Sequence, residues 1–363
     1  MATPISRRQF TAATLAAGLT AARAGAQVAQ PPREVPWLAQ VQAPPPVLPP
    51  DAPNLQSLLL TGRGDPIRTL DGWRARREEY RNGWLEFLGT WDPPRWRPEF
   101  QIVEADRTAH VSRQLIRYES ERNVPVEAYL IRPIKVNRPL PGVVVLHSTV
   151  DYTIRQGAGL EGDPAAHWGL KLAERGFVAI CPRCFLWEDG APPNLQGAVA
   201  RHQRRHPNTR GMAKMLYDAR RALDVLTTLP EVDPNRLAAA GHSLGAKEAL
   251  YLAAFGDRVK ATVSSEGGIG TAFSNWDAPW YLGEKVMGHD HHEILGLVAP
   301  RAFLLIGGDS ADGARSWPYI ARALEVYRMY PQPPHIGLFN HGAGHRIPPA
   351  AEGRCYEWLQ AYL

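Results

Sequence analysis

A Gly-x-Ser-x-Gly pentapeptide, residues 241–245, holds the residue with the clearest chemical potential in this sequence. Glycine two residues either side of a serine is typical of a sharp strand-to-helix turn, because larger side chains would collide there. Residues 236–243 predict a buried strand and residues 244–255 a helix. Ser243 would then lie at a helix N-terminus, where backbone N–H groups favour negative charge. Ser243 is therefore a candidate nucleophile.

Such a nucleophile needs a base, because a serine hydroxyl at its ordinary pKa attacks poorly and must lose its proton as it reacts. Two histidines, His341 and His345, follow the last predicted strand. His341 ends the strand pattern, so packing or hydrogen bonding is expected of it. His345 lies in a glycine-flanked loop that can reach the edge of the sheet. We predict that His345 is the base.

The elements that must position these residues are short apolar runs alternating with helical patterns. Continuous runs of this kind are expected of strands covered on both faces of a parallel sheet. They lie at residues 142–148, 177–182, 236–243, 259–265, 301–308 and 335–341. Two alternating segments, 110–120 and 124–133, predict an antiparallel hairpin, and residues 71–88 predict a helix. The expected fold class is α/β, with a doubly wound, mostly parallel sheet and an N-terminal hairpin and helical extension.

The first 70 residues divide into two segments. Residues 1–26 contain the pair Arg7-Arg8, a weakly apolar run and an A-x-A-type cleavage site, which together predict a twin-arginine signal peptide. Export to the periplasm or the medium is expected. Residues 27–70 are rich in proline and predict a linker or a strap over the surface, ahead of a domain at 71–363.

Composition limits the partners. The formal net charge of +5 falls to +2 without the leader arginines Arg7, Arg8 and Arg23, so there is no electrostatic case for nucleic acid binding. Cys181 and Cys184 form a C-x-x-C pair with no second pair at zinc spacing. Buried or bridged structural cysteines are expected.

Residues from about 70 to 363 resemble the α/β-hydrolase superfamily, and within it the branch of dienelactone hydrolases, acetyl xylan esterases and glucuronoyl-esterase-like enzymes. The stretches that carry the resemblance are VVVLHST, GHSLGAKEALYLAAF, SSEGGIG, HEILGLVAPRAFLLIGGDSADG and FNHGAGH. The resemblance implies a catalytic triad in the chain order serine, acid, histidine.

The resemblance also suggests the triad acid. It aligns Asp312 best with the usual acid, whereas Glu266 stands where some glucuronoyl-esterase-like enzymes hold theirs. Asp309 is a third candidate that could instead bond the turn backbone. We predict Asp312, with Glu266 and then Asp309 as alternatives.

The oxyanion hole is expected from two backbone N–H groups, one following the nucleophile and one at the end of the first parallel strand. The first is the N–H of Leu244. The second comes from residues 147–149, and Thr149 is preferred to Ser148 as its source.

The long aromatic segment 273–293 is a candidate substrate wall. Its tryptophans and tyrosine, with one further tryptophan, could stack on a sugar or an aromatic acid, or could simply pack in the core. The candidates are Trp276, Trp280, Tyr281 and Trp187. Glucuronoyl esterases usually have arginine after the nucleophile, whereas this sequence has Leu244. Lys247, one turn further on, is expected at the surface or in a salt bridge.

The acidic and histidine-rich run His289, Asp290, His291, His292 and Glu293 invites a metal interpretation. Three histidines within four positions cannot face one point on a helix, however, and the H-E-x-x-H spacing is absent. We predict no metal but a solvated helix start, with Asp290 as a candidate N-cap.

These features predict an exported serine hydrolase that cleaves carboxylic esters through an acyl-enzyme, without a metal or organic cofactor. Small-molecule or carbohydrate esters, including lactones, are the expected substrates, with no nucleic acid partner and no membrane association after signal removal. One alternative is a catalytically silent hydrolase-fold protein that binds a glycan or a metal through residues 273–293. Another is a peptidase of the prolyl-oligopeptidase type, which is disfavoured because the chain has no room for a propeller domain.

Overall fold

The structure is a computed structural model that describes residues 34–92, 96–286 and 288–363. These residues lie in one compact unit, Pro32–Leu363. The predicted signal peptide, residues 1–26, lies outside the described residues.

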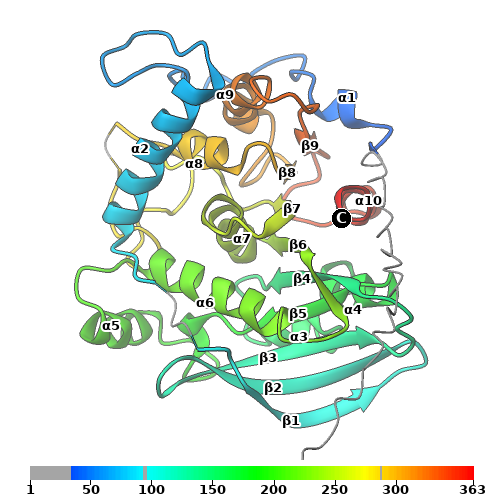
Figure 1. Ribbon diagram of the computed structural model, residues 1–363. Coiled ribbons are helices and arrows are strands. Elements are labelled where there is room, and N and C mark those ends of the chain that lie inside the picture. Colours follow the sequence, from blue (N-terminus) through cyan, green and yellow to red (C-terminus); the bar gives the residue numbers. More distant parts are fainter. Residues whose placement is uncertain (1–33, 93–95, 287) are drawn as a thin grey trace, which may run out of the picture. The chain divides into compact units, whose positions relative to one another are not determined.

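The described strands form one nine-stranded sheet with the order β1-β2-β3-β5-β4-β6-β7-β8-β9 (Figure 1). The strands are β1 Phe100–Arg107, β2 Val111–Glu121, β3 Val124–Pro133, β4 Leu140–Leu146, β5 Val178–Pro182, β6 Val232–His242, β7 Val259–Ser265, β8 Ala302–Gly307 and β9 Ile336–Asn340. β1, β2 and β3 pair antiparallel, β3 pairs antiparallel with β5, and the strands from β5 to β9 in that order are parallel. The predicted hairpin and mostly parallel sheet are confirmed, whereas β1 was not predicted.

Helices cover both faces of this sheet. The α-helices are α1 Leu38–Val41, α2 Leu70–Leu88, α3 Ile154–Gly157, α4 Trp168–Glu174, α5 Leu195–Arg205, α6 Gly211–Leu226, α7 Leu244–Phe255, α8 His291–Val298, α9 Trp317–Tyr327 and α10 Pro349–Tyr362. Short 3-10 helices lie at Pro164–Ala166, Phe185–Trp187 and Ala314–Ser316. One apolar core joins the sheet to α2, α5, α6, α7, α8 and α9, and a second joins the opposite face to α1, α3, α4 and α10. None of the described helices is long and apolar enough to cross a membrane.

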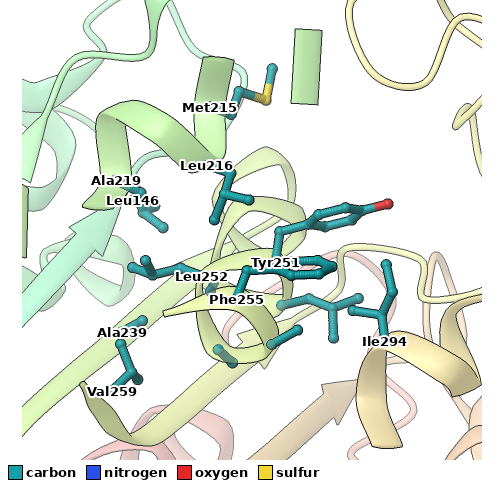
Figure 2. Packing of buried hydrophobic residues seen from close by; sticks show 14 of the residues in the cluster. Leu146, Met215, Leu216, Ala219, Ala239, Tyr251, Leu252, Phe255, Val259 and Ile294 are labelled. Carbon is teal, nitrogen blue, oxygen red and sulfur yellow. The ribbon is translucent and has the colours of Figure 1, made fainter. Parts of the chain in front are cut away.

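The helix α7 runs through the middle of the larger core, and all twelve of its residues are buried. Figure 2 shows Tyr251, Leu252 and Phe255 of α7 among side chains of α6, β6 and α8. A helix surrounded on all sides in this way has no solvent face. The end of α7 that follows Ser243 is therefore held by the core.

Residues 34–70 pack against the sheet and its helices. Trp37 is buried and stacks on Trp358 of α10 at 5.7 Å between ring centroids. Val41 packs on β9, where a Cβ on Gly337 would lie 2.3 Å from Val41 Cγ2. Leu58 is fully buried. In the described part of the segment, these contacts fit a surface strap rather than a free linker.

The cysteines are buried and unbridged. Cys181 and Cys184 are free thiols, as is Cys355, and the first two lie in different cores on opposite faces of the sheet. Burial raises the pKa of each thiol, so none of the three is poised as a thiolate nucleophile.

Candidate active site

Ser243 occupies the strained turn that the pentapeptide predicts. It follows β6 with φ 60° and ψ −118°, a backbone conformation that non-glycine residues rarely adopt. A Cβ on Gly245 would lie 2.1 Å from the carbonyl oxygen of Leu146, and one on Gly241 would lie 2.2 Å from the backbone of Gly245. Both glycines are required by this close approach. The turn presents Ser243 at the N-terminus of α7.

The parallel strands carry the other candidates to the same edge of the sheet. Thr149 follows β4, Ser243 follows β6, Glu266 follows β7, and His345 lies five residues after β9. The amide of Ser243 donates to the carbonyl of Ser265 at 2.8 Å, so the nucleophile candidate is tied to the residue before Glu266. The carboxyl ends of parallel strands form the usual site of chemistry in such sheets.

Glu266 is the carboxyl group that contacts His345. Its Oε2 lies 3.0 Å from His345 Nδ1, and an ionised carboxylate only accepts, so Nδ1 is the donor. Oε2 also accepts from the amide of Ala311 at 2.8 Å, and Oε1 accepts from the amide of Gly308. Burial raises the pKa of Glu266, but the bonds from His345, Ala311 and Gly308 outweigh it and lower that pKa below its ordinary value. Glu266 is thus held ionised.

Asp312 does not contact His345, which corrects the preferred assignment of the acid. Its carboxylate is fully buried and accepts from the amides of Gly268 and Ile269, at 2.7 and 2.8 Å, and from Ser316 Oγ. Burial raises the pKa of Asp312 above its ordinary value. The geometry therefore makes Asp312 a clamp for the loop after β7.

Asp309, the third candidate, bonds the turn after β8. Its Oδ1 accepts from the amide of Ala314 at 3.0 Å and from Asn340 Nδ2 at 2.8 Å. This is the turn-bonding role that the sequence allowed for Asp309.

The ring of His345 faces the nucleophile turn. Because Nδ1 of His345 is bonded to Glu266, Nε2 is the ring nitrogen that remains to accept a proton from the Ser243 hydroxyl. The ring lies 4.8 Å from the ring of His242, the residue before Ser243, measured between centroids. The hydrogen bonds among the described residues do not include one from Ser243 Oγ to His345, and such bonds often form only once substrate is bound.

His242 is a neighbour of His345 that the sequence did not single out. Its Nδ1 lies 3.0 Å from Ser265 Oγ. Burial and the nearby His345 lower the pKa of His242 to about 4, against an opposing effect of Glu266. The His242 ring is therefore neutral near pH 7 and adds no positive charge beside His345.

His341, the other candidate base, lies outside this arrangement. Its Nδ1 accepts from the amide of Ala343 at 3.1 Å, a local bond within its own loop. Burial lowers the pKa of His341. Among the two histidines, His345 is the one bonded to a carboxylate.

The amides of Leu244 and Thr149 remain the candidate donors for an oxyanion. Because α7 begins at Leu244, the amide of Leu244 belongs to the first-turn amides that have no intrahelical acceptor. The amide of Ser148 already donates to Gln156 Oε1 at 3.0 Å, which favours Thr149 as the second donor.

The predicted aromatic wall is largely core. Trp276, Tyr281 and Trp187 are 1%, 5% and 1% exposed, and Trp276 Nε1 donates to the carbonyl of Gly268 at 2.7 Å. None of these three rings has a free face for a sugar. Trp280 is half-buried and keeps part of its surface. The substrate-stacking assignment is therefore not supported for the three buried rings.

Lys247 is buried, which corrects the expectation of a surface or salt-bridge lysine. It is 5% exposed, its Nζ donates to Ser274 Oγ at 2.7 Å, and Nζ lies 3.9 Å from the ring centroid of Trp276. Among the described residues, no carboxylate forms a salt bridge with it. Burial lowers the pKa of Lys247 to about 7. Sequence spacing could not reveal this burial, because it depends on the loop that folds over α7.

The histidine-rich run leads into α8, and its last three residues, His291, His292 and Glu293, are buried rather than solvated, whereas His289 before the helix is exposed. Asp290 is the N-cap and accepts from the amide of His291, as expected. His291 is fully buried between Tyr251 Oη and the carbonyl of Ile269, at 2.9 and 2.6 Å. Within the described ranges no group of three or more histidine, cysteine or acidic side chains could hold a metal ion.

Comparison with known proteins places the chain among similar folds. Residues 126–277, which include Ser243 and Glu266, match the model of the dienelactone hydrolase family. A glucuronoyl esterase from Solibacter usitatus is 15% identical, with 87% of this chain and 99% of that chain covered and a TM-score of 0.66. A glucuronoyl esterase from Teredinibacter turnerae is 19% identical, with 84% of this chain and 88% of that chain covered and a TM-score of 0.60. An acetyl xylan esterase from a Paenibacillus species is 18% identical, with 79% of this chain and 94% of that chain covered and a TM-score of 0.53.

No curated protein sequence matches the chain. At these identities the structural similarity establishes the fold alone. The chain has the α/β-hydrolase fold, and its predicted resemblance to carboxylic ester hydrolases is confirmed by the family match and by the fold.

Proposed function

We propose that this chain is a serine esterase whose triad is Ser243, His345 and Glu266. The observation that carries the proposal is the 3.0 Å contact between His345 Nδ1 and Glu266 Oε2, at the sheet edge where Ser243 is presented. Ser243 Oγ attacks the ester carbonyl while His345 Nε2 takes its proton. Glu266 fixes the tautomer of His345 and stabilises the imidazolium that forms.

The remaining steps follow from the same groups. The amides of Leu244 and Thr149 stabilise the oxyanion of the tetrahedral intermediate. His345 Nε2 then gives its proton to the departing alcohol oxygen, which leaves an acyl group on Ser243. A water molecule, deprotonated by His345, hydrolyses this acyl-enzyme and restores the free serine.

We further propose esters of carbohydrates, or lactones, as the substrates. The structural neighbours described as glucuronoyl and acetyl xylan esterases support this class. The leader at residues 1–26 supports export by the twin-arginine route, which would bring the enzyme to extracellular polysaccharides.

Labelling with a fluorophosphonate probe tests the nucleophile. The wild-type protein is expected to be labelled, and the Ser243→Ala variant is expected to lose labelling, because the proposal places the activated hydroxyl at Ser243. Ser310→Ala, an exposed serine in the loop after β8, is the matched control and should be labelled normally. An unlabelled wild type, or labelling that persists in Ser243→Ala, would contradict the proposal.

A further inference from the structure

We propose that a cavity between α5 and the β2–β3 hairpin binds a sugar residue of the substrate at a distance from the reacting ester. The cavity has a volume of about 420 Å³, within the usual range for small-ligand sites. This inference rests on the proposed esterase function and narrows its substrate class to esters of oligosaccharides.

The cavity lies near the edge of the sheet that carries Ser243. Cys184 and Phe185, which line it, follow the carboxyl end of β5. The order β5-β4-β6 separates β5 from the nucleophile strand by two strand spacings, or about 10 Å. The amide of Cys184 donates to His147 Nε2 at 3.1 Å, two residues before Thr149. A substrate that reaches both places must be longer than one sugar ring.

Charged side chains in the cavity are held in fixed pairs. Arg117 and Arg183 each lie 2.7 Å from an oxygen of Glu127, and Arg201 bonds both Glu188 and Asp189. The side chains of Arg183 and Arg201 are 26% and 29% exposed, so both still face solvent. A guanidinium has five N–H groups and a carboxylate has about four lone pairs, so these pairs retain donors and acceptors for a ligand. Neighbouring hydroxyl groups of a sugar can hydrogen-bond to the planar guanidinium and carboxylate groups of these fixed pairs.

An apolar wall faces these pairs. Val124, Val126 and Phe185 line the cavity and are nearly buried. A pyranose ring has both hydroxyl edges and apolar C–H faces, so it can use both walls. The five cationic and four acidic side chains of the lining nearly cancel, which suits a neutral or singly acidic sugar rather than a polyanion.

Two neighbouring arginines allow a matched test. Arg205, in the last turn of α5, lines the cavity, whereas Arg204 is exposed on the same helix and does not. Arg205→Gln and Arg204→Gln remove the same charge, so any difference between them reflects position. Arg201→Gln is a second cavity variant. Thermal unfolding confirms that each variant is folded.

The substrates are an aryl acetate, an acetylated xylo-oligosaccharide, and an oligosaccharide that carries a methyl-esterified glucuronate. In wild-type enzyme, kcat/KM is expected to rise with the number of sugar units. In Arg205→Gln and Arg201→Gln, kcat/KM for the oligosaccharide esters should fall about tenfold, the effect of losing one charge-assisted hydrogen bond. The aryl acetate should be unaffected, and Arg204→Gln should behave as wild type.

Three results would overturn the subsite: equal losses on the aryl acetate and the oligosaccharides, the same loss in Arg204→Gln, or a wild-type kcat/KM independent of chain length. The aryl acetate separates this inference from the proposed function. If wild-type enzyme hydrolyses it without any preference for longer sugars, only the subsite is refuted. If neither the aryl acetate nor any oligosaccharide ester is hydrolysed, the esterase function is refuted as well.

Discussion

Glu266 and Asp312 are two buried carboxyl groups at one edge of the sheet, and their hydrogen bonds differ in kind. Glu266 bonds an imidazole as well as backbone amides, and its pKa lies below the ordinary value. Asp312 bonds two amides and a hydroxyl, and its pKa lies above the ordinary value. Glu266 can therefore stabilise a charged His345, whereas Asp312 holds the loop after β7 in place.

This difference gives a prediction for paired variants. Glu266→Gln should lower kcat by about 10⁴, because a neutral amide no longer selects the productive histidine tautomer. Asp312→Asn should leave kcat within about tenfold but lower the melting temperature, because an amide provides only one acceptor for the bonds it replaces. Steady-state kinetics and thermal unfolding measure both effects. A loss of kcat in Asp312→Asn as large as that in Glu266→Gln, with an unchanged melting temperature, would reverse the assignment.

The sequence was sufficient to single out Ser243 and His345 for the proposed triad but not the carboxyl group that contacts His345. The serine motif is local, since both glycines are required by contacts within a few ångströms. The choice among acids depends on which carboxyl group turns toward the edge, and Glu266 does so through a positive φ of 54° that spacing does not reveal. The turn containing Asp309 and Asp312 supplies backbone amides to Glu266.

At the scale of elements, α7 shows why the burial of charged residues was missed. Its hydrophobic pattern predicts a helix correctly, but Lys247 and Glu248 suggest a solvent face. In the fold, α6, α8 and the loop after β7 surround α7, so that both charged residues are less than 6% exposed. Such cover comes from segments far away in the chain, which local periodicity does not describe.

Glu248 makes this burial measurable. Burial, followed by the charge of Asp218, raises its pKa to about 8 from 4.5. Above about pH 4.5 the unfolded chain loses this proton while the folded chain keeps it, so the free energy of unfolding falls as pH rises toward 8. Glu248→Gln removes this titration. Relative to wild type, the variant should therefore gain about 3–5 kcal/mol of stability between pH 4.5 and 8.5.

Urea unfolding at pH 4.5, 6.5 and 8.5 checks this expectation. Glu86→Gln, at an exposed position of α2, is the control and should follow wild type at each pH. A stability difference between Glu248→Gln and wild type that stays constant from pH 4.5 to 8.5 would show that Glu248 does not hold its proton in the folded protein.

At the scale of the whole molecule, the central strands were predictable and the edge strand was not. The parallel strands are buried on both faces and read as continuous apolar runs. Seven of the eight residues of β1 are exposed, including Ile102 and Val103, so its sequence shows neither a continuous run nor an alternation. The described strap residues were also ambiguous, because proline-rich segments can pack or stay free.

The whole chain also permits a test of export. Since the described fold contains three buried, unbridged cysteines, it needs no disulfide and can form in a reducing compartment. Passage in the folded state by the twin-arginine route is compatible with this. Replacing the pair by Arg7→Lys and Arg8→Lys should abolish appearance of the enzyme in the periplasmic fraction while active enzyme accumulates inside the cell. Unchanged export of this variant would argue against the route, and Arg23→Lys is the control.

The bond between the amide of Ser243 and the carbonyl of Ser265 has a mechanical consequence. It ties the turn that carries Ser243 to the peptide just ahead of Glu266, so the serine and the acid of the proposed triad are held beside each other. Any structural adjustment to a bulky substrate then falls to the exposed loop that carries His345, the third residue of the proposed triad. The side chain of His345 is 43% exposed. Closing on a bound substrate would then be a motion of the loop that carries His345 toward the fixed residues Ser243 and Glu266.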